Sequence, residues 1–198
     1  KCIKKQLYGD AYLVRFADDF LIMFQYERDA QRVYEAVIKR MELFGLELSK
    51  EKTRILPFGR HSVSRETFDF LGFTHFNSKT RKGYYTVGHK ISRKKKKQFK
   101  SNLKKWVKEN RNTQFDEFMK TLNKKLTGSV NYYSLSGMIK EVRNLWIHSL
   151  YVTFKWLNRR SQRKSFKLEK FYEIWNDRII RPYIHVDIWS GDKVIYNK

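Results

Sequence analysis

The hydrophobic pattern of the chain changes near Lys90, and this change restricts the possible folds more than any other feature. Before that point, short apolar runs such as residues 12–16 and 20–24 are separated by turn residues, which is typical of β-strands. After it, apolar residues recur every three or four positions, which indicates amphipathic helices. We therefore predict an α+β fold with two parts, a strand-containing part at 1–90 and a helical part at 91–198.

The first part is expected to hold a hairpin, a long helix and further strands. The hairpin turn is Ala17-Asp18-Asp19, and apolar residues on both sides of its second strand predict a sheet covered on both faces. The helix should run from Glu27 to Phe44, with Gly45 as its C-terminal stop. The further strands are expected at residues 52–56, 68–73 and 84–87.

The second part is expected to contain four helices. Apolar residues at helical spacing place them around residues 99–107, 115–126, 138–156 and 168–175. Thr113 and Asp116 predict a capping pair for the second helix, and Gly128 predicts its end. The aromatic residues of these helices fall on the buried period, so we interpret them as core and not as base-stacking platforms.

The charge of the chain predicts a polyanionic partner. Of 198 residues, 43 are Lys or Arg and 20 are Asp or Glu, giving a net charge of +23, of which residues 1–90 carry +6 and residues 91–198 carry +17. Nucleic acid is the commonest polyanion that neutralises such an excess. An acidic membrane surface is the alternative, but no apolar run approaches the roughly 20 residues of a membrane span. Nucleic acid is therefore the favoured partner, with no membrane.

The content of cysteine and histidine argues against a zinc site. Cys2 is the only cysteine, so no disulfide can form within the chain, and the five histidines have no ligand spacing. A reducing compartment fits this composition, either a bacterial cytoplasm or an organelle.

Asp18 and Asp19 are the candidate metal ligands. Adjacent carboxylates in a rigid hairpin turn are hard oxygen ligands of the kind that Mg²⁺ uses when it also holds substrate phosphates. A solvated Asp-Asp turn is the structural alternative, and the dipeptide by itself does not exclude it.

Several blocks of the sequence resemble one enzyme family. Residues 12–24 (YLVRFADDFLIMF) resemble the catalytic hairpin of reverse transcriptases, with Phe16 where the family usually has Tyr. Residues 45–53 (GLELSKEKT) resemble the next block of group II intron enzymes, and Phe70-Leu71-Gly72-Phe73 resembles their primer-grip block. Residues 126–133 (LTGSVNYY) and 155–160 (KWLNRR) resemble the maturase-specific thumb region. Because the blocks follow the family's order, the chain is identified as similar to the C-terminal palm and thumb/maturase region of a group II intron-type reverse transcriptase/maturase.

This resemblance implies an RNA-directed DNA polymerase that serves retrotransposition and intron splicing. Its partners would be an RNA template, intron RNA, a DNA primer or target, and dNTPs. Asp18 would bind catalytic Mg²⁺ and Asp19 would support it. Lys52 would protonate the leaving pyrophosphate, although a solvated lysine is an equal alternative. The residues expected at the primer and nucleotide site are Phe16, Ala17, Phe70, Leu71, Gly72 and Phe73.

The sequence departs from the family pattern in three ways. Phe16 lacks the usual tyrosine hydroxyl, and Ser129 stands where the thumb block normally has an aromatic residue. The first catalytic aspartate and the fingers have no counterpart, since Asp10 lies in a turn and not in an apolar strand. We therefore expect a C-terminal fragment that is inactive alone, whose two-metal site is completed by a residue from a missing N-terminal half.

Two basic runs are predicted to bind RNA. Cations in the first turn of a helix oppose the helix dipole by roughly 0.3–1 kcal/mol each, and a bound phosphate would reverse this penalty. A solvated basic face is the alternative. The first run is Arg93, Lys94, Lys95, Lys96 and Lys97, and the second is Arg159, Arg160, Arg163 and Lys164.

Two other functions stay open. The chain could be a non-enzymatic splicing cofactor that grips intron RNA and keeps the palm only as scaffold, although intact Asp18-Asp19 argues against this. It could also belong to a reverse transcriptase of an antiphage or CRISPR-associated system. A metal-binding aspartate on a strand of the missing N-terminal half would support the polymerase.

Overall fold

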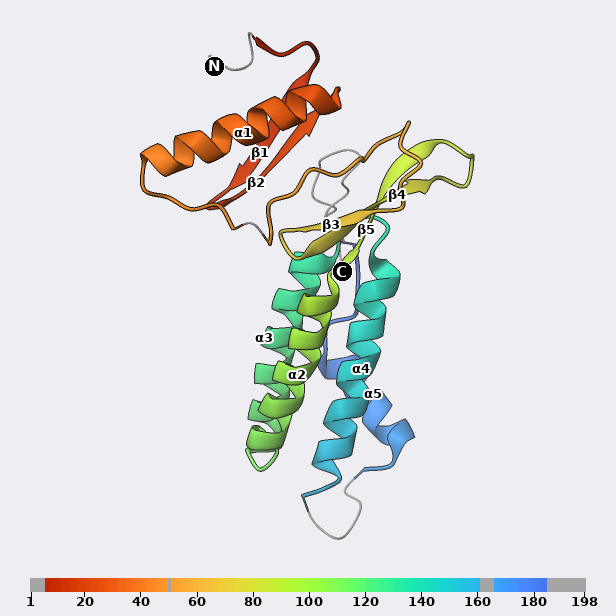
Figure 1. The fold of residues 1–198 in the computed structure, drawn as a ribbon. Helices are drawn as coiled ribbons and strands as arrows, with labels where there is room; N and C mark the ends of the chain where they lie inside the picture. The colour runs from red at the N-terminus through yellow and green to blue at the C-terminus, as the bar shows by residue number, and fades with distance from the viewer. Residues whose placement is uncertain (1–5, 50, 161–165, 185–198) are drawn as a thin grey trace. The chain divides into compact units, whose positions relative to one another are not determined.

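The computed structural model describes residues 6–49, 51–160 and 166–184 and shows a mixed α+β chain (Figure 1). Two small antiparallel sheets come first and a group of helices follows, which confirms the predicted fold class. The chain divides into two compact units, one formed by Lys1–Leu71 and His75–Gly88 and the other by Gly72–Thr74 and His89–Lys198.

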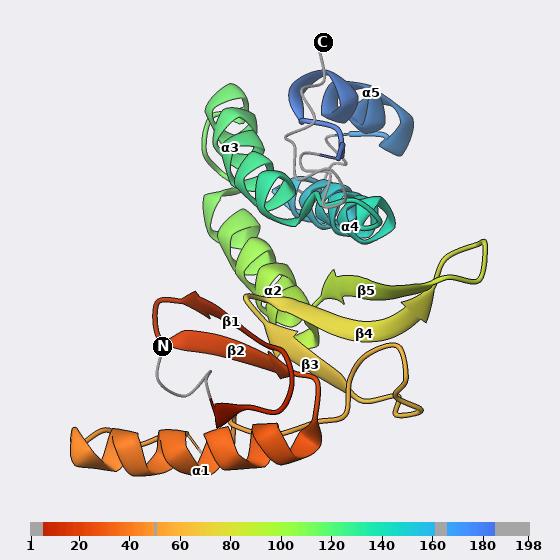
Figure 2. The same cartoon turned by 90° about the horizontal axis from the view of Figure 1, so that it is seen from above.

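The first unit begins with the predicted hairpin. Strands β1 (Ala11–Phe16) and β2 (Asp19–Phe24) pair antiparallel, from Ala11 opposite Phe24 to Phe16 opposite Asp19. Helix α1 (Glu27–Leu43) follows and contacts β2 (Figures 1 and 2). The helix ends as predicted at Gly45, which has a φ of 66°. The Gly45 amide donates a hydrogen bond to the Glu42 carbonyl, and the Leu46 amide donates one to the Met41 carbonyl. Together these two hydrogen bonds form a Schellman motif.

The prediction of a hairpin covered on both faces is wrong for the described residues. Five of the six residues of β1 are exposed, among them Leu13 at 63% and Phe16 at 64%. A two-stranded sheet beside one helix cannot bury both of its faces. The apolar side chains of β1 therefore form an exposed surface of the kind that usually receives another segment or partner.

The second sheet has three strands in the order β3-β4-β5, with β4 in the middle (Figure 2). The strands are β3 (Thr67–Phe70), β4 (Phe73–Lys79) and β5 (Tyr85–Ile91). The single strand predicted at 68–73 is thus two strands, because the chain turns at Leu71-Gly72. The strand predicted at 52–56 does not form. In this segment the Arg54 guanidinium donates a hydrogen bond to the Thr67 carbonyl at 2.6 Å. The segment is thus joined to Thr67 by a side-chain hydrogen bond and not by the backbone hydrogen bonds of a strand.

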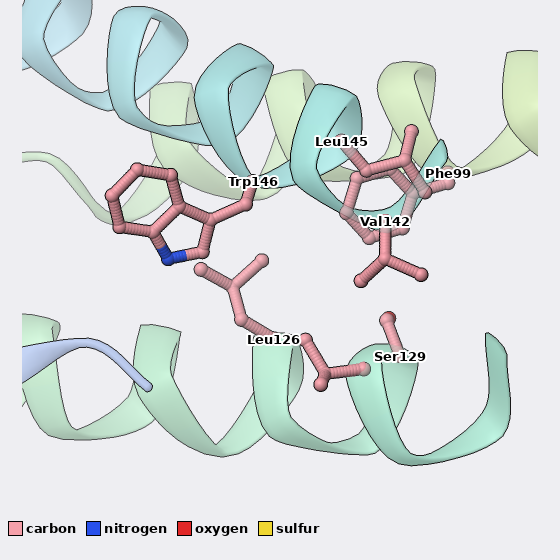
Figure 3. Close-up of a pocket in the computed structure, with 7 residues that line it drawn as sticks. Phe99, Leu126, Ser129, Val142, Leu145 and Trp146 are labelled. Carbon is pink, nitrogen blue, oxygen red and sulfur yellow. The ribbon is translucent and has the colours of Figure 1, made fainter. Parts of the chain in front are cut away.

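The helical unit has one main core. Helices α2 (Arg93–Asn110), α3 (Phe115–Tyr133), α4 (Ile139–Leu157) and α5 (Leu168–Arg178) enclose it. Its most buried large side chains include Phe118, Phe171 and Trp175. These aromatic residues lie in the core, as their spacing predicts. A small cavity of about 10 Å³ between α2, α3 and α4 is lined by apolar residues and Ser129 (Figure 3). It is too small for an organic ligand.

Two local predictions for α3 are wrong. The helix continues through Gly128, because Leu126 and Val130 lie one turn apart in the core and their burial outweighs the roughly 1 kcal/mol cost of a helical glycine. Its N-cap is Gln114, without a side-chain hydrogen bond, while Asp116 forms an ion pair with Arg178 of α5.

None of the helices in the described ranges is long and apolar enough to span a membrane.

Candidate functional site

The candidate metal ligands lie at the tight turn of the β1–β2 hairpin, Asp18 in the turn and Asp19 at the start of β2. Phe16 pairs with Asp19, so Ala17 and Asp18 alone connect β1 to β2. Ala17 has a φ of 51°, a left-handed conformation that costs a non-glycine residue roughly 1–2 kcal/mol. The Arg15 side chain donates from Nε to the Ala17 carbonyl at 2.9 Å and holds the turn. Strain of this kind is often kept at functional sites.

Both carboxylates of this turn are accessible. Asp18 and Asp19 are exposed, and neither forms an ion pair with another residue of the described part. Mg²⁺ is commonly held by one or two carboxylates together with water and substrate phosphates, so this pair fits such an ion. No cluster of three or more metal-binding side chains occurs in the portion that the structure describes. The hairpin therefore presents two candidate ligands, and the remaining coordination positions of an ion would have to be filled by substrate or by other groups.

The block Phe70-Leu71-Gly72-Phe73 is also a two-residue hairpin turn. Leu71 and Gly72 have φ values of 50° and 82°, and positive φ at both central positions is the mark of a type I′ turn. Leu71, like Ala17, is a non-glycine residue in the left-handed region. Both short motifs of the sequence therefore occupy strained tight turns between strands.

In the helical unit, this turn meets the maturase-like block. The Phe73 ring stacks on Tyr132 with centroids 5.7 Å apart and meets the edge of Tyr133 at 5.5 Å. The Gly72 carbonyl accepts a hydrogen bond from the Ser92 amide at 2.9 Å. Burial, with a contribution from Tyr132, raises the pKa of Tyr133. Residues from two separate blocks of the sequence thus form one cluster.

Sequence reasoning missed the role of Tyr132 and Tyr133. The sequence marks them only as the end of the maturase-like block and does not indicate that they are partners of Phe73. The available signal was the spacing of Tyr132, which does not fall on the apolar period of Leu122 and Leu126. In the structure Tyr132 is 53% exposed at the end of α3.

The first basic run begins α2. Ser92 is the N-cap and accepts the Lys95 amide at 3.4 Å, and the first turn of α2 contains no acidic residue. Lys96 forms an ion pair with Glu141 of α4, with Nζ and carboxylate oxygen 2.5 Å apart. Its four neighbours in the run are exposed and form no salt bridge with any residue in the described ranges: Arg93, Lys94, Lys95 and Lys97. Lys96 is thus less available to a ligand than the others.

The second basic run lies only partly within the described residues. Arg159 is exposed and lies over the Trp156 ring, 5.2 Å from its centroid. Arg160 is partly buried, its Nε and Nη2 have no hydrogen-bond partner within the described ranges, and burial lowers the pKa of its guanidinium. Arg163 and Lys164 lie outside the described residues.

Lys52 lies in a turn after α1. Its side chain is exposed and its amide donates to the Ser49 carbonyl at 3.0 Å. No salt bridge joins it to Asp18 or Asp19 among the described residues, so its role stays a prediction.

Comparison with known families gives two matches. Residues 1–75 match the family "Reverse transcriptase (RNA-dependent DNA polymerase)". Residues 96–174 match the family "Group II intron, maturase-specific domain". A search of curated proteins finds no significant match. The first match includes the Asp18-Asp19 hairpin and the second includes α3 and α4, and together they span most of the sequence. The chain therefore joins a segment similar to reverse transcriptases to a segment similar to the group II intron maturase-specific domain, which is consistent with a group II intron reverse transcriptase/maturase.

Proposed function

We propose that the chain supplies the metal-binding hairpin and the RNA-binding thumb of an RNA-directed DNA polymerase that also acts as an intron maturase. The observation that carries this proposal is the exposed Asp18-Asp19 pair, which lies in a strained turn within the reverse transcriptase match. The substrates would be dNTPs, a DNA primer or target, and an RNA template or intron RNA. A bacterial cytoplasm or an organelle would be its compartment.

The proposed chemistry is attack of a primer 3′-OH on an incoming nucleotide. Asp18 and Asp19 would hold Mg²⁺, which when bound stabilises the charge that develops on the phosphate oxygens. Two ions also need a bridging carboxylate from outside this pair, and we assign it to a palm segment that precedes these residues in the polymerase. Phe16 and Ala17 would border the primer end, and Lys52 would donate a proton to the leaving group.

The block from Phe70 to Phe73 is proposed to hold the primer strand. Its support is the cluster of Phe73 with Tyr132 and Tyr133, because these rings give the turn a rigid backing in the helical unit. A rigid backing keeps a positioned strand within the small tolerance that catalysis permits.

The start of α2 is proposed to bind RNA phosphates. Four exposed cations there oppose the positive end of the helix dipole, and a bound phosphate would turn this unfavourable arrangement into a favourable one. We place the boundary between the palm part and the thumb part near Lys90. The interval between the two family matches, which end at residue 75 and begin at residue 96, is consistent with this position.

Primer extension tests the polymerase proposal. The chain is assayed with an RNA template, a DNA primer, dNTPs and Mg²⁺, both alone and mixed with the preceding fingers and palm segment of its polymerase. Extension in the mixture, and its loss in Asp18→Asn, is the expected result. Extension by the chain alone would contradict the assignment of a bridging carboxylate outside Asp18-Asp19.

A second function is favoured by the maturase-specific match alone. A chain that promotes intron splicing without any extension in the mixture would be a splicing cofactor with a palm that serves as scaffold. Extension on a template RNA other than intron RNA, with no effect on intron splicing, would favour an antiphage or CRISPR-associated reverse transcriptase.

A further inference from the structure

The loop that joins β4 to β5 is an exposed tip with a fixed backbone. Thr80 and Tyr84 face each other across it, since the Thr80 amide donates to the Tyr84 carbonyl at 2.8 Å and the Tyr84 amide donates to Thr80 Oγ1 at 3.1 Å. The Gly83 amide donates to the Thr80 carbonyl at 2.9 Å, and Gly83 has a φ of 84°. A tight turn followed by a left-handed glycine is a common short hairpin loop with a G1 bulge.

The base of this tip is braced from the side. Strand β3 has only four residues, so β4 and β5 extend past its start to reach the tip (Figures 1 and 2). Beyond β3, Asn77 joins the hairpin to the preceding loop. Its Nδ2 donates to the Ser64 carbonyl at 3.3 Å, and its Oδ1 accepts the Gly59 amide at 3.2 Å and the Tyr85 hydroxyl at 3.0 Å. The tip therefore stands on a supported part of the first unit.

The tip carries three cations without a neutralising partner of its own. Arg81 and Lys82 are the central residues of the turn, Lys79 ends β4, and all three are exposed. None of them forms a salt bridge with another residue in the described ranges. The sequence contains no Asp or Glu between Asp69 and Glu109, so the strands on either side of the tip supply no negative charge.

Tyr84 adds an exposed aromatic ring to these cations. It is 69% exposed, whereas the next residue, Tyr85, is partly buried and donates its hydroxyl to Asn77. Successive side chains along a strand point to opposite faces, so Tyr84 points away from the face that Asn77 braces. One face of the tip is thus used to hold the hairpin in place, and the other presents a ring to solvent.

Folding requirements explain the cations of the tip but not its ring. Lysine near the end of a sheet discourages pairing with other sheets, so Lys79 and Lys82 have an ordinary structural reason to be there. Glycine, asparagine, aspartate and serine are the usual residues of such turns, and an exposed tyrosine serves neither the turn nor solubility. An aromatic face beside unneutralised cations is instead the combination by which proteins hold unpaired bases and the phosphates next to them.

We propose that the β4–β5 tip binds an unpaired nucleotide, whose base stacks on Tyr84 and whose flanking phosphates contact Arg81 and Lys82. The site, which rests on the proposed RNA-binding function, lies in the first unit and is separate from the basic runs at 93–97 and 159–164. Loops, bulges and displaced strands supply such nucleotides. The interior of a duplex does not, because its bases are already stacked and offer no free face to a side chain.

Two matched RNA ligands test the site in the full chain. One is a stem that ends in a loop of unpaired adenosines, and the other has the same length and is fully paired. Tyr84→Leu should weaken binding of the looped ligand by about 5- to 100-fold, as for the loss of one stacked base, and should leave the paired ligand unchanged. Tyr84→Phe keeps the ring and should bind both ligands like the wild type. The same loop made of DNA shows which nucleic acid supplies the nucleotide.

A charge-matched pair of variants tests the phosphate contacts. Arg81→Gln with Lys82→Gln should weaken binding of the looped ligand more than that of the paired ligand. Lys120→Gln with Lys124→Gln removes the same charge from exposed positions of α3 and should change the ratio of the two affinities little. An equal change of this ratio in both double variants would overturn the role of Arg81 and Lys82.

Photocrosslinking locates the base without any variant, so its result does not depend on how a substitution affects folding. A looped ligand with 5-iodouridine in place of one adenosine, irradiated on the wild-type chain, should crosslink to the peptide that contains Tyr84. Crosslinks at other peptides alone would overturn the site, as would equal binding of the looped ligand by wild type and Tyr84→Leu.

Two more outcomes have a definite meaning. If poly-glutamate binds the wild-type chain more tightly than the looped ligand does, and Tyr84→Leu loses this binding, the tip is a contact for an acidic protein and the nucleotide site is wrong. A wild-type chain that binds neither RNA ligand would refute the proposed RNA-binding function itself.

Discussion

The Asp29 carboxylate accepts the Gly9 amide at 3.0 Å, and the same oxygen, Oδ2, also accepts the Tyr8 amide at 3.0 Å. Asp29 is buried in the first turn of α1, so this pair of hydrogen bonds anchors the segment that leads into β1. The β1–β2 hairpin is therefore tied at its base to the helix that follows it.

Asp29→Ala should destabilise the first unit by about 2–3 kcal/mol. Two backbone amides would lose a charged acceptor, and each unsatisfied donor costs about 1–3 kcal/mol, partly relieved by water. Urea unfolding followed by far-UV circular dichroism measures the change. Glu35→Gln, on the exposed face of α1, is the matched control and should unfold like the wild type.

Gly9→Ala should destabilise the same region by a separate route. A Cβ at this position would lie 2.7 Å from Cδ2 of Tyr26, closer than carbon atoms approach, so the ring or the backbone would have to move. The expected cost is about 1–3 kcal/mol, as for other overpacked sites. Unchanged stability in this variant would show that the Tyr26 ring moves freely.

Asp18→Asn should abolish primer extension by the chain mixed with its fingers and palm segment, without weakening RNA binding. A single carboxylate is a ligand for the metal ion and makes no attractive contact with phosphates. Glu35→Gln removes the same charge elsewhere on the unit and should extend primers normally. Extension above a few per cent of wild type in Asp18→Asn would remove Asp18 from the metal site.

Lys97→Gln and Lys96→Gln should have different effects, although the residues are neighbours. Lys97 is exposed, so its replacement should lower the salt slope of RNA binding by roughly 0.7–0.9. Lys96 is paired with Glu141, so its replacement should change the thermal midpoint more than the slope. Equal reductions of the slope would mean that RNA displaces Glu141 from Lys96.

The helical unit should lose stability in mild acid. Burial, and secondarily the charge of Lys100, lowers the pKa of His148 in the folded chain, and burial lowers the pKa of His89. The unfolded imidazoles therefore bind protons more readily, so the stabilisation is complete above about pH 6.5 and is lost as the pH falls through the lower folded values. Urea midpoints at pH 7.5 and 5.0 measure the loss, which His148→Gln should reduce.

Local patterns allowed much of the fold to be predicted. The hairpin around Ala17-Asp18, the end of α1 at Gly45 and the course of α4 depend on residues close together in the sequence, where turn chemistry and periodicity act directly. The errors arose where distant residues decided the result. Gly128 stays helical because α3 packs in a core, and residues 52–56 are held by Arg54 rather than by a strand.

The sequence by itself determined the type of most elements, the family resemblance, and the carboxylates and cations available for chemistry, because composition and spacing carry that information. Only the tertiary structure decided which of these groups meet. It placed Phe73 against Tyr132, neutralised Lys96 with Glu141, and gathered Lys108, Arg111 and Arg159 around Trp156. Such contacts join residues from different helices and strands, so they depend on how those elements pack and not on any pattern that a single segment contains.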